Sequence, residues 1–155
     1  MCEGKEYGYH YQEKGYKRIE FTNQNRFYIV NTYDEMKSDV TDAVEFSPAL
    51  IVDGELAVGG FYDWNGINPR ACIGQSSRGE ILMLVVEGRL TSRSIGTDVE
   101  TCAKILMRHD GYTAMNLDGG ASAIMWFDGE YVTKCSNGGT SRNLPNAWVY
   151  GNYDG

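Results

Sequence analysis

The segment Asn116-Leu117-Asp118-Gly119-Gly120-Ala121-Ser122 places one carboxylate on a two-glycine turn between two apolar runs. Upstream, residues 112–117 predict a short strand, and downstream, residues 121–127 predict another. The second run ends at Asp128-Gly129, a pair that is typical of a tight hairpin turn. This order predicts strands that meet at turns, with the Asp118 carboxylate at the end of one of them.

The same turn is the best candidate in the chain for a reaction centre. Gly119 and Gly120 permit backbone angles that are closed to other residues and let a ligand approach the main chain. They also leave N–H groups that can point at an anion. A plain β-turn with a capping Asp118 explains the same residues, so the neighbouring segments must decide between the two interpretations.

Further motifs accompany this turn in a fixed order. Before it come Pro69-Arg70-Ala71-Cys72-Ile73-Gly74-Gln75 and Glu87-Gly88-Arg89, and after it come Ser136-Asn137-Gly138-Gly139 and Arg142. From about residue 47 to residue 150, this string resembles the phosphodiester glycosidase family, with Glu100 at the position of a family helix. Ala71, Glu87 and Ala121 stand where the family usually has Thr, Asp and a third Gly.

The resemblance covers only part of the family domain. The family carries an upstream strand and an Asn-Gly-Gly-Phe-Phe-like segment that is not found in its usual place. Gly59-Gly60-Phe61-Tyr62 looks similar, but it follows the strand predicted at residues 49–52, which is the wrong order, so we interpret it as a loop. We therefore expect one domain over residues 1–155 that lacks the leading segment of the family and part of the usual pocket.

The resemblance implies a hydrolase that cleaves the glycosidic bond of a sugar-1-phosphodiester. The leaving group is a phosphate monoester, so cationic contacts can substitute for a strong general acid. Arg70, Arg142 and Arg89 are the candidates, because a guanidinium pairs two phosphate oxygens at once. Glycosyl transfer to water also needs a carboxylate, for which Asp118 is the first choice and Glu87 the second.

Other residues of the motifs have two roles open to them. Ser122 either donates to a phosphate oxygen or begins a strand, and Asn116 either holds a sugar hydroxyl or makes a turn bond. Gly119 and Gly120 offer backbone amides to the same ligand. Glu100 is interpreted as a helix-capping residue rather than a catalytic one.

Two functions of another class stay open. The fold can serve as a non-catalytic carbohydrate- or polymer-binding module, for instance in a phage or cell-surface assembly, which the altered positions and the missing segment favour. The chain can also be a structural fragment that another chain completes. Asp118, Arg70 and Arg142 favour the enzyme.

Composition and charge exclude several partners. The 155 residues are 42% hydrophobic and 23% charged, which is ordinary for one globular domain. A net charge of -7 argues against nucleic acid, because no basic stripe is available for phosphates. No run approaches the about 18 apolar residues of a membrane helix, and the N-terminus does not resemble a secretory leader. We expect a small or polymeric sugar-phosphate partner and no membrane, and localisation stays open.

The four cysteines form no recognisable framework. Cys2, Cys72, Cys102 and Cys135 lack Cys-x-x-Cys spacing, and the chain has only two histidines. This pattern predicts free thiols, no zinc site and no metal or other cofactor. Cys72 and Cys102 fall in apolar patterns and are expected in the core.

The chain as a whole predicts an α+β fold, a mixed, hairpin-rich β-sheet with two helices packed on it. Hairpins are expected from residues 18–22 with 26–30, 49–52 with 56–58, and 71–75 with 80–86. Capping boxes at Thr32/Glu35 and Thr97/Glu100 predict helices at about residues 33–40 and from Val99 to near Asp110. A last strand is expected at residues 147–150.

Two further expectations concern exposure. Residues 81–86 are apolar at every position, which predicts a strand covered on both faces. A sheet without its leading strand exposes an edge that can pair with another chain. We expect the hairpin of residues 18–30 to cover that edge, with self-association as the alternative.

Overall fold

Antiparallel strands make up most of the regular structure in the computed structural model, which describes residues 1–5, 15–58, 66–139 and 141–151. A five-stranded sheet has the order β5-β4-β8-β6-β7. Its strands are β4 (Ala49–Val52), β5 (Glu55–Leu56), β6 (Arg70–Ser76), β7 (Ile81–Val86) and β8 (Gly111–Asn116). A three-stranded sheet has the order β2-β1-β3, with β1 (Lys17–Thr22), β2 (Phe27–Asn31) and β3 (Val40–Phe46). A small hairpin, β9 (Trp126–Phe127) with β10 (Glu130–Tyr131), follows a single 3-10 turn at Gly120–Ser122.

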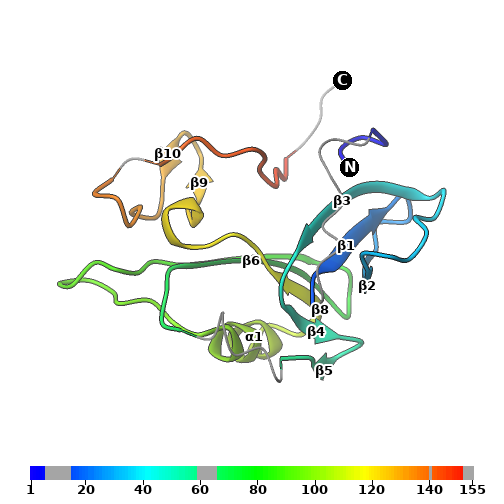
Figure 1. Ribbon diagram of the computed structural model, residues 1–155, viewed down its shortest axis with the longest axis horizontal. Helices are drawn as coiled ribbons and strands as arrows, with labels where there is room; N and C mark the ends of the chain where they lie inside the picture. Colours follow the sequence, from blue (N-terminus) through cyan, green and yellow to red (C-terminus); the bar gives the residue numbers. More distant parts are fainter. Residues whose placement is uncertain (6–14, 59–65, 140, 152–155) are drawn as a thin grey trace.

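The five-stranded sheet is the middle layer of the fold. Helix α1 (Val99–Arg108) lies on one side of it and the three-stranded sheet on the other (Figure 1). On β8, Ala114 packs toward α1, whereas the next residue, Met115, packs against Ile19 and Phe27 of the three-stranded sheet. Successive side chains of a strand point to opposite faces, so the central strands hold two separate cores.

The predicted hairpins are confirmed. β1 pairs with β2, β4 with β5, β6 with β7, and β9 with β10, all antiparallel. Asn25, Asp53 and Asp128 have φ angles of 58°, 51° and 48° at these turns. Asn and Asp tolerate this left-handed region better than most residues, which is why the turn signals in the sequence are reliable.

Helix α1 is confirmed with a different cap. Its N-cap is Asp98, whose carboxylate accepts from the Thr101 N–H at 2.7 Å, and not Thr97 as the capping box predicts. The backbone of Thr97 is engaged elsewhere, in two hydrogen bonds with Asn68. Glu100 pairs with Lys104 on the exposed face at 2.6 Å.

The prediction of a helix at residues 33–40 is wrong. The described residues contain one α-helix rather than two. The Asp34 carboxylate accepts from the Asn31 N–H at 2.8 Å, which closes a local turn. The carbonyls of Thr32 and Asp34 accept from the Arg18 guanidinium at 3.4 and 2.8 Å. A buried arginine therefore takes carbonyls that a helix would need.

Three other expectations need correction. Residues 121–127 form a 3-10 turn and a two-residue strand, because the backbone folds back on the glycine turn. Residues 147–150 pair with no strand among the described residues, although Trp148 packs edge-on to Phe27 at 5.4 Å. β7 is an edge strand with Met83 38% exposed, so it is not covered on both faces.

The first hairpin does not cover a sheet edge. β1 and β2 pair with β3 in their own sheet, which lies on the face of the five-stranded sheet.

Among the described residues, no helix has the length and the apolar character that a membrane crossing requires. All four cysteines are free thiols, and Cys72 and Cys102 lie in the core as expected. The segment 59–62 lies outside the described residues.

Candidate functional site

Asp118, Ser122 and Arg142 form a hydrogen-bonded cluster just beyond the end of β8. The Ser122 hydroxyl donates to Asp118 Oδ2 at 2.7 Å, and the Arg142 guanidinium binds the same carboxylate oxygen. Arg142 Nε also donates to Ser122 Oγ at 2.8 Å. The side chains of Asp118 and Arg142 are 50% and 54% exposed, so the cluster is open to a ligand.

The glycine turn holds this cluster against the start of β6. The Gly120 N–H donates to the Pro69 carbonyl at 3.0 Å. A Cβ atom on Gly119 would lie 2.5 Å from that carbonyl oxygen, closer than any side chain can approach. Gly120 has a φ of 59°, a conformation that favours glycine. Close approach explains the first glycine, and backbone conformation explains the second.

Arg89 lies over the same turn. A Cβ on Gly120 would be 3.3 Å from Arg89 Nη1, and Arg89 Nη2 donates to Asn68 Oδ1 at 2.7 Å. Gly88 packs closely against Gly96, because a Cβ added to Gly88 would lie 2.8 Å from the Gly96 Cα. The predicted phosphate ligands Arg89 and Arg142 therefore both reach the Asp118 turn from other segments.

Arg70 is buried behind the turn, with 4% exposure. Its Nε donates to the Thr97 carbonyl at 3.1 Å, and its Nη2 donates to the Gly66 carbonyl at 2.5 Å. Burial lowers the pKa of the guanidinium, an effect that Cys102, Cys72 and Asp98 partly oppose. These contacts of Arg70 are with other groups than those that Arg142 binds, so the convergence of the two arginines on one anion stays a prediction.

Glu87 binds a different set of groups. Its carboxylate pairs with Arg93 and accepts from the Lys134 N–H at 2.7 Å. The bond from Arg93, followed by the one from Lys134, lowers the pKa of Glu87. These contacts join the segment after β7 to the segment after β10, so the structure gives Glu87 a connecting role. Its catalytic role stays a prediction.

Asn116 is the last residue of β8 and is 1% exposed. Its Nδ2 donates to the Ser47 carbonyl at 2.8 Å, and its Oδ1 has no partner among the described residues. A buried acceptor without a partner is uncommon in folded proteins. A sugar hydroxyl can satisfy it only if the covering groups move, so the predicted contact stays a prediction.

The structure thus brings together most of the predicted site. Around the Pro69 carbonyl lie the glycine turn, Arg89, and the cluster of Asp118, Ser122 and Arg142. Sequence reasoning missed Asn68, which binds Arg89, and Arg93, which binds Glu87. The Asn-Pro pair before Arg70 is a turn signal that marks Asn68, whereas no pattern marks Arg93.

The chain is similar to known proteins in sequence and in fold. A family model described as phosphodiester glycosidase matches residues 3–150, so the similarity starts well before residue 47, where the motifs alone place it. The structure of the zebrafish N-acetylglucosamine-1-phosphodiester alpha-N-acetylglucosaminidase catalytic domain, auto-inhibited by its pro-peptide, is similar with a TM-score of 0.63 and 18% identity. The match covers 77% of this chain and 45% of that chain.

A second solved structure, a hypothetical protein from Synechocystis, has a TM-score of 0.50 and 15% identity, covering 78% of this chain and 31% of that one. This chain therefore spans less than half the length of either. No curated protein matches the chain. At these identities the two structures support the fold alone.

Proposed function

The chain belongs to the phosphodiester glycosidase family, and from this premise we propose that it is a hydrolase that cleaves the glycosidic bond of a sugar-1-phosphodiester. The observation that carries the proposal is the cluster of Asp118, Ser122 and Arg142 on the glycine turn, with Arg89 beside it. A carboxylate, a hydroxyl and two guanidinium groups at one open site suit a substrate that carries both a sugar and a phosphate.

The phosphate is proposed to bind Arg142 and Arg89. Arginine remains charged and pairs two oxygens at once, which suits a diester that becomes a monoester dianion on cleavage. In the structure, Arg142 pairs with Asp118. Substrate binding would transfer Arg142 to the phosphate and leave the carboxylate facing the sugar. Ser122 remains close enough to donate to a phosphate oxygen.

Asp118 is proposed to act at the anomeric carbon. The bond between this carbon and the phosphate oxygen breaks, and the oxygen of a water molecule forms the new bond, so the products are a free sugar and a phosphate monoester. A carboxylate serves either as the nucleophile or as the base for water in such a reaction. Because the leaving phosphate takes the bonding electrons, Arg142 and Arg89 stabilise charge that develops there.

Buried residues are proposed to position this site. Arg70 joins the Gly66 and Thr97 carbonyls, and its charge adds to the positive potential behind the turn. Asn116 anchors the end of β8 to Ser47. Glu87 is proposed to fix neighbouring loops through Arg93, and it is the substitute catalytic carboxylate if Asp118 is not required.

A non-catalytic carbohydrate-binding module is the second candidate. The mutual pairing of Asp118 and Arg142 favours it, because a carboxylate and a guanidinium that neutralise each other also suit the binding of sugar hydroxyls. Binding without turnover, unaffected by removal of the phosphate from the ligand, would support this candidate.

The test compares sugar-1-phosphodiesters with a glycoside that lacks the phosphate. The protein is incubated with methyl N-acetylglucosamine-1-phosphodiester, after the sugar named for the zebrafish enzyme, and with other sugar-1-phosphodiesters. The matched control is the methyl glycoside without phosphate. The proposal predicts release of free sugar from at least one diester and none from the control. Absence of turnover across the diesters would contradict it.

A further inference from the structure

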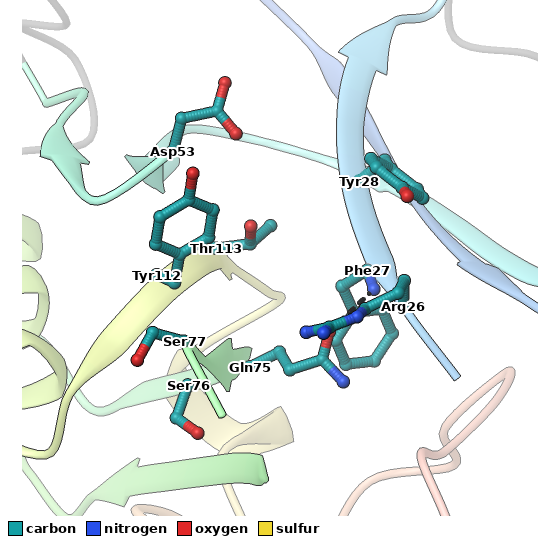
Figure 2. A pocket seen from close by; sticks show the side chains of 9 residues that line it. All are labelled: Arg26, Phe27, Tyr28, Asp53, Gln75, Ser76, Ser77, Tyr112 and Thr113. Atoms are coloured by element: carbon teal, nitrogen blue, oxygen red, sulfur yellow. Dashed lines mark hydrogen bonds between the residues drawn. The ribbon is translucent and has the colours of Figure 1, made fainter. Parts of the chain in front are cut away.

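A groove with a volume of about 360 Å³ lies at the other end of the five-stranded sheet from Asp118, and Figure 2 shows the side chains that line it. Tyr112, near the start of β8, lines it, whereas Asp118 follows the end of the same strand. Six strand residues span roughly 20 Å, so the groove is separate from the candidate active site. Its volume falls within the range of small-ligand sites, about 300–1,000 Å³.

Three hydrogen bonds of Gln75 hold the groove in shape, and two of them reach across to the β1–β2 hairpin. The Gln75 side chain accepts from the Phe27 N–H at 3.0 Å and donates to the carbonyls of Asn25 and Gly79 at 2.8 and 3.0 Å. These bonds use both amide hydrogens and the carbonyl oxygen of Gln75, so this residue forms the floor rather than a ligand contact. The groove is preformed.

The walls carry the groups that remain for a ligand. Figure 2 shows Tyr112 and Asp53 on one wall, facing Tyr28 and Arg26 on the other. The two tyrosines are 43% and 46% exposed. Neither Arg26 nor Asp53 has an ion pair or side-chain hydrogen bond with any described residue.

Each aromatic ring is supported on one side. Lys37 Nζ lies 5.6 Å from the centre of the Tyr28 ring. On the other wall, the Tyr112 ring packs over Gly54, where an added Cβ would lie 3.4 Å from Tyr112 Cδ2. Packing on one side restricts the rings, so less side-chain entropy is lost when a ligand contacts the exposed side.

The chemistry of the walls selects a neutral, hydroxylated ring. Arg26 and Asp53 carry opposite charges, so for a ligand with a net charge the attraction to one of them is offset by repulsion from the other. Sugar hydroxyls both donate and accept hydrogen bonds, which matches a guanidinium, a carboxylate and two phenolic hydroxyls. The apolar face of a sugar ring can pack on a tyrosine ring, whose polar tip remains available for hydrogen bonds.

We propose that this groove is a second carbohydrate-binding site, which holds one neutral sugar unit of a glycan between Tyr28 and Tyr112. The choice of a glycan over other polyols rests on the proposed function, because a sugar polymer that carries the reacting phosphodiester can also occupy a site farther along the sheet. The groove itself belongs to residues outside the candidate active site.

The test is a titration of the ¹⁵N-labelled protein with phosphate-free chitotetraose, cellotetraose and maltotetraose, followed by amide chemical shifts. At least one probe is expected to give saturable shifts at Tyr28 and Tyr112 below about 10 mM. Tyr112→Ala should weaken that binding by about tenfold, the range of aromatic contacts. Tyr150→Ala, which removes an 80% exposed tyrosine outside the groove, should leave the dissociation constant unchanged.

A second variant keeps the test valid if Tyr112→Ala does not fold. Asp53→Asn removes an exposed charge and should also weaken binding several-fold. The proposal is overturned if no probe gives saturable shifts in the groove, if the shifts lie around Asp118 instead, or if the folded groove variants bind as the wild type does. Groove binding without diester turnover contradicts only the proposed function, and turnover without groove binding contradicts only the groove.

Discussion

At the scale of single residues, Gly119 shows how a motif residue is fixed by a backbone contact. The Pro69 carbonyl occupies the place of a side chain at this position, at 2.5 Å from an added Cβ. Gly119→Ala must therefore displace the turn that carries Asp118. We expect a loss of about 1–3 kcal/mol in the free energy of unfolding, as for other overpacked sites.

Gly119→Ala should also lower diester turnover, because the Asp118 carboxylate moves with the turn. Urea denaturation and the sugar-release assay measure the two effects. Gly151→Ala is the matched control, since an added Cβ there meets nothing within 4 Å. Equal stability and turnover for the Gly119→Ala and Gly151→Ala proteins would show that the close contact has no consequence.

The lowered pKa of Asp98 predicts how the stability of the protein changes with pH. The bond from the Thr101 N–H is the main cause that lowers the pKa of Asp98. Because the folded pKa lies below the unfolded one, the stabilisation is full above the unfolded pKa and is lost as pH falls through the folded pKa. Asp98→Ala should cost about 1 kcal/mol at neutral pH. The difference in the free energy of unfolding between the wild type and Asp98→Ala should disappear as pH falls through the lowered pKa. Denaturation at a series of acidic pH values measures it, and a difference that stays constant with pH would contradict the prediction.

The residues of the site were predictable to different degrees. Asp118, Ser122 and Arg142 carry chemistry that the sequence displays, and the structure places them in contact. Asn68 was not predictable, because its role depends on Arg89, a residue that reaches it only in the folded chain.

At the scale of elements, a buried ion pair explains why one predicted helix is absent. Arg18 and Glu20 are adjacent on one face of β1, with 3% exposure each, and are 2.7 Å apart. Arg18 also binds the carbonyls of residues 32 and 34. The local helix signal at residues 33–40 is outweighed because a buried guanidinium without these acceptors would be costly.

Removing one partner of this pair should be strongly destabilising. Glu20→Ala leaves the Arg18 charge buried, with Glu45 at 3.7 Å as its remaining acid partner in the described chain. We expect a loss of about 3–5 kcal/mol in the free energy of unfolding. The control is Glu100→Ala, which breaks the exposed pair with Lys104 and should cost about 0.5 kcal/mol or less. Similar losses in guanidinium denaturation would contradict the buried pair.

Elements with strong local signals were predictable, and elements held by distant contacts were not. The hairpins have turn residues that encode their own conformation, such as Asn25 and Asp128. The spacing of the apolar residues in α1 likewise gives the helix one apolar face, which packs on the sheet. Residues 121–127 have the composition of a strand, but hydrogen bonds from Ser122 to Asp118 and to the Gly119 carbonyl bend them into a turn.

At the scale of the molecule, the layer order gives the first hairpin a role that its sequence does not reveal. Ile19 and Phe27 form one core with Ile73 and Met115 of the middle sheet. Strand signals show that a hairpin forms, but which surface it covers depends on contacts between distant residues.

Deleting the residues before Asn31 should therefore expose this core. We expect an insoluble product or one that unfolds without cooperativity, because Met115 and Ile73 lose their cover. Solubility, light scattering and the urea transition test this. A truncated chain that is soluble, monomeric and cooperatively folded would show that the hairpin is an appendage.

The proposed hydrolysis of a sugar-1-phosphodiester depends above all on Asp118 of the glycine turn. The most direct measurement is kcat of Asp118→Asn with a diester that the wild type cleaves, beside the melting temperature. Asp128→Asn removes the same charge from a hairpin turn with φ 48° and is the control. We predict that Asp118→Asn loses turnover by at least about 10³-fold, as for other essential catalytic groups, with a melting temperature near that of the control. Undiminished kcat in Asp118→Asn would contradict the claim and make Glu87 the carboxylate to test next.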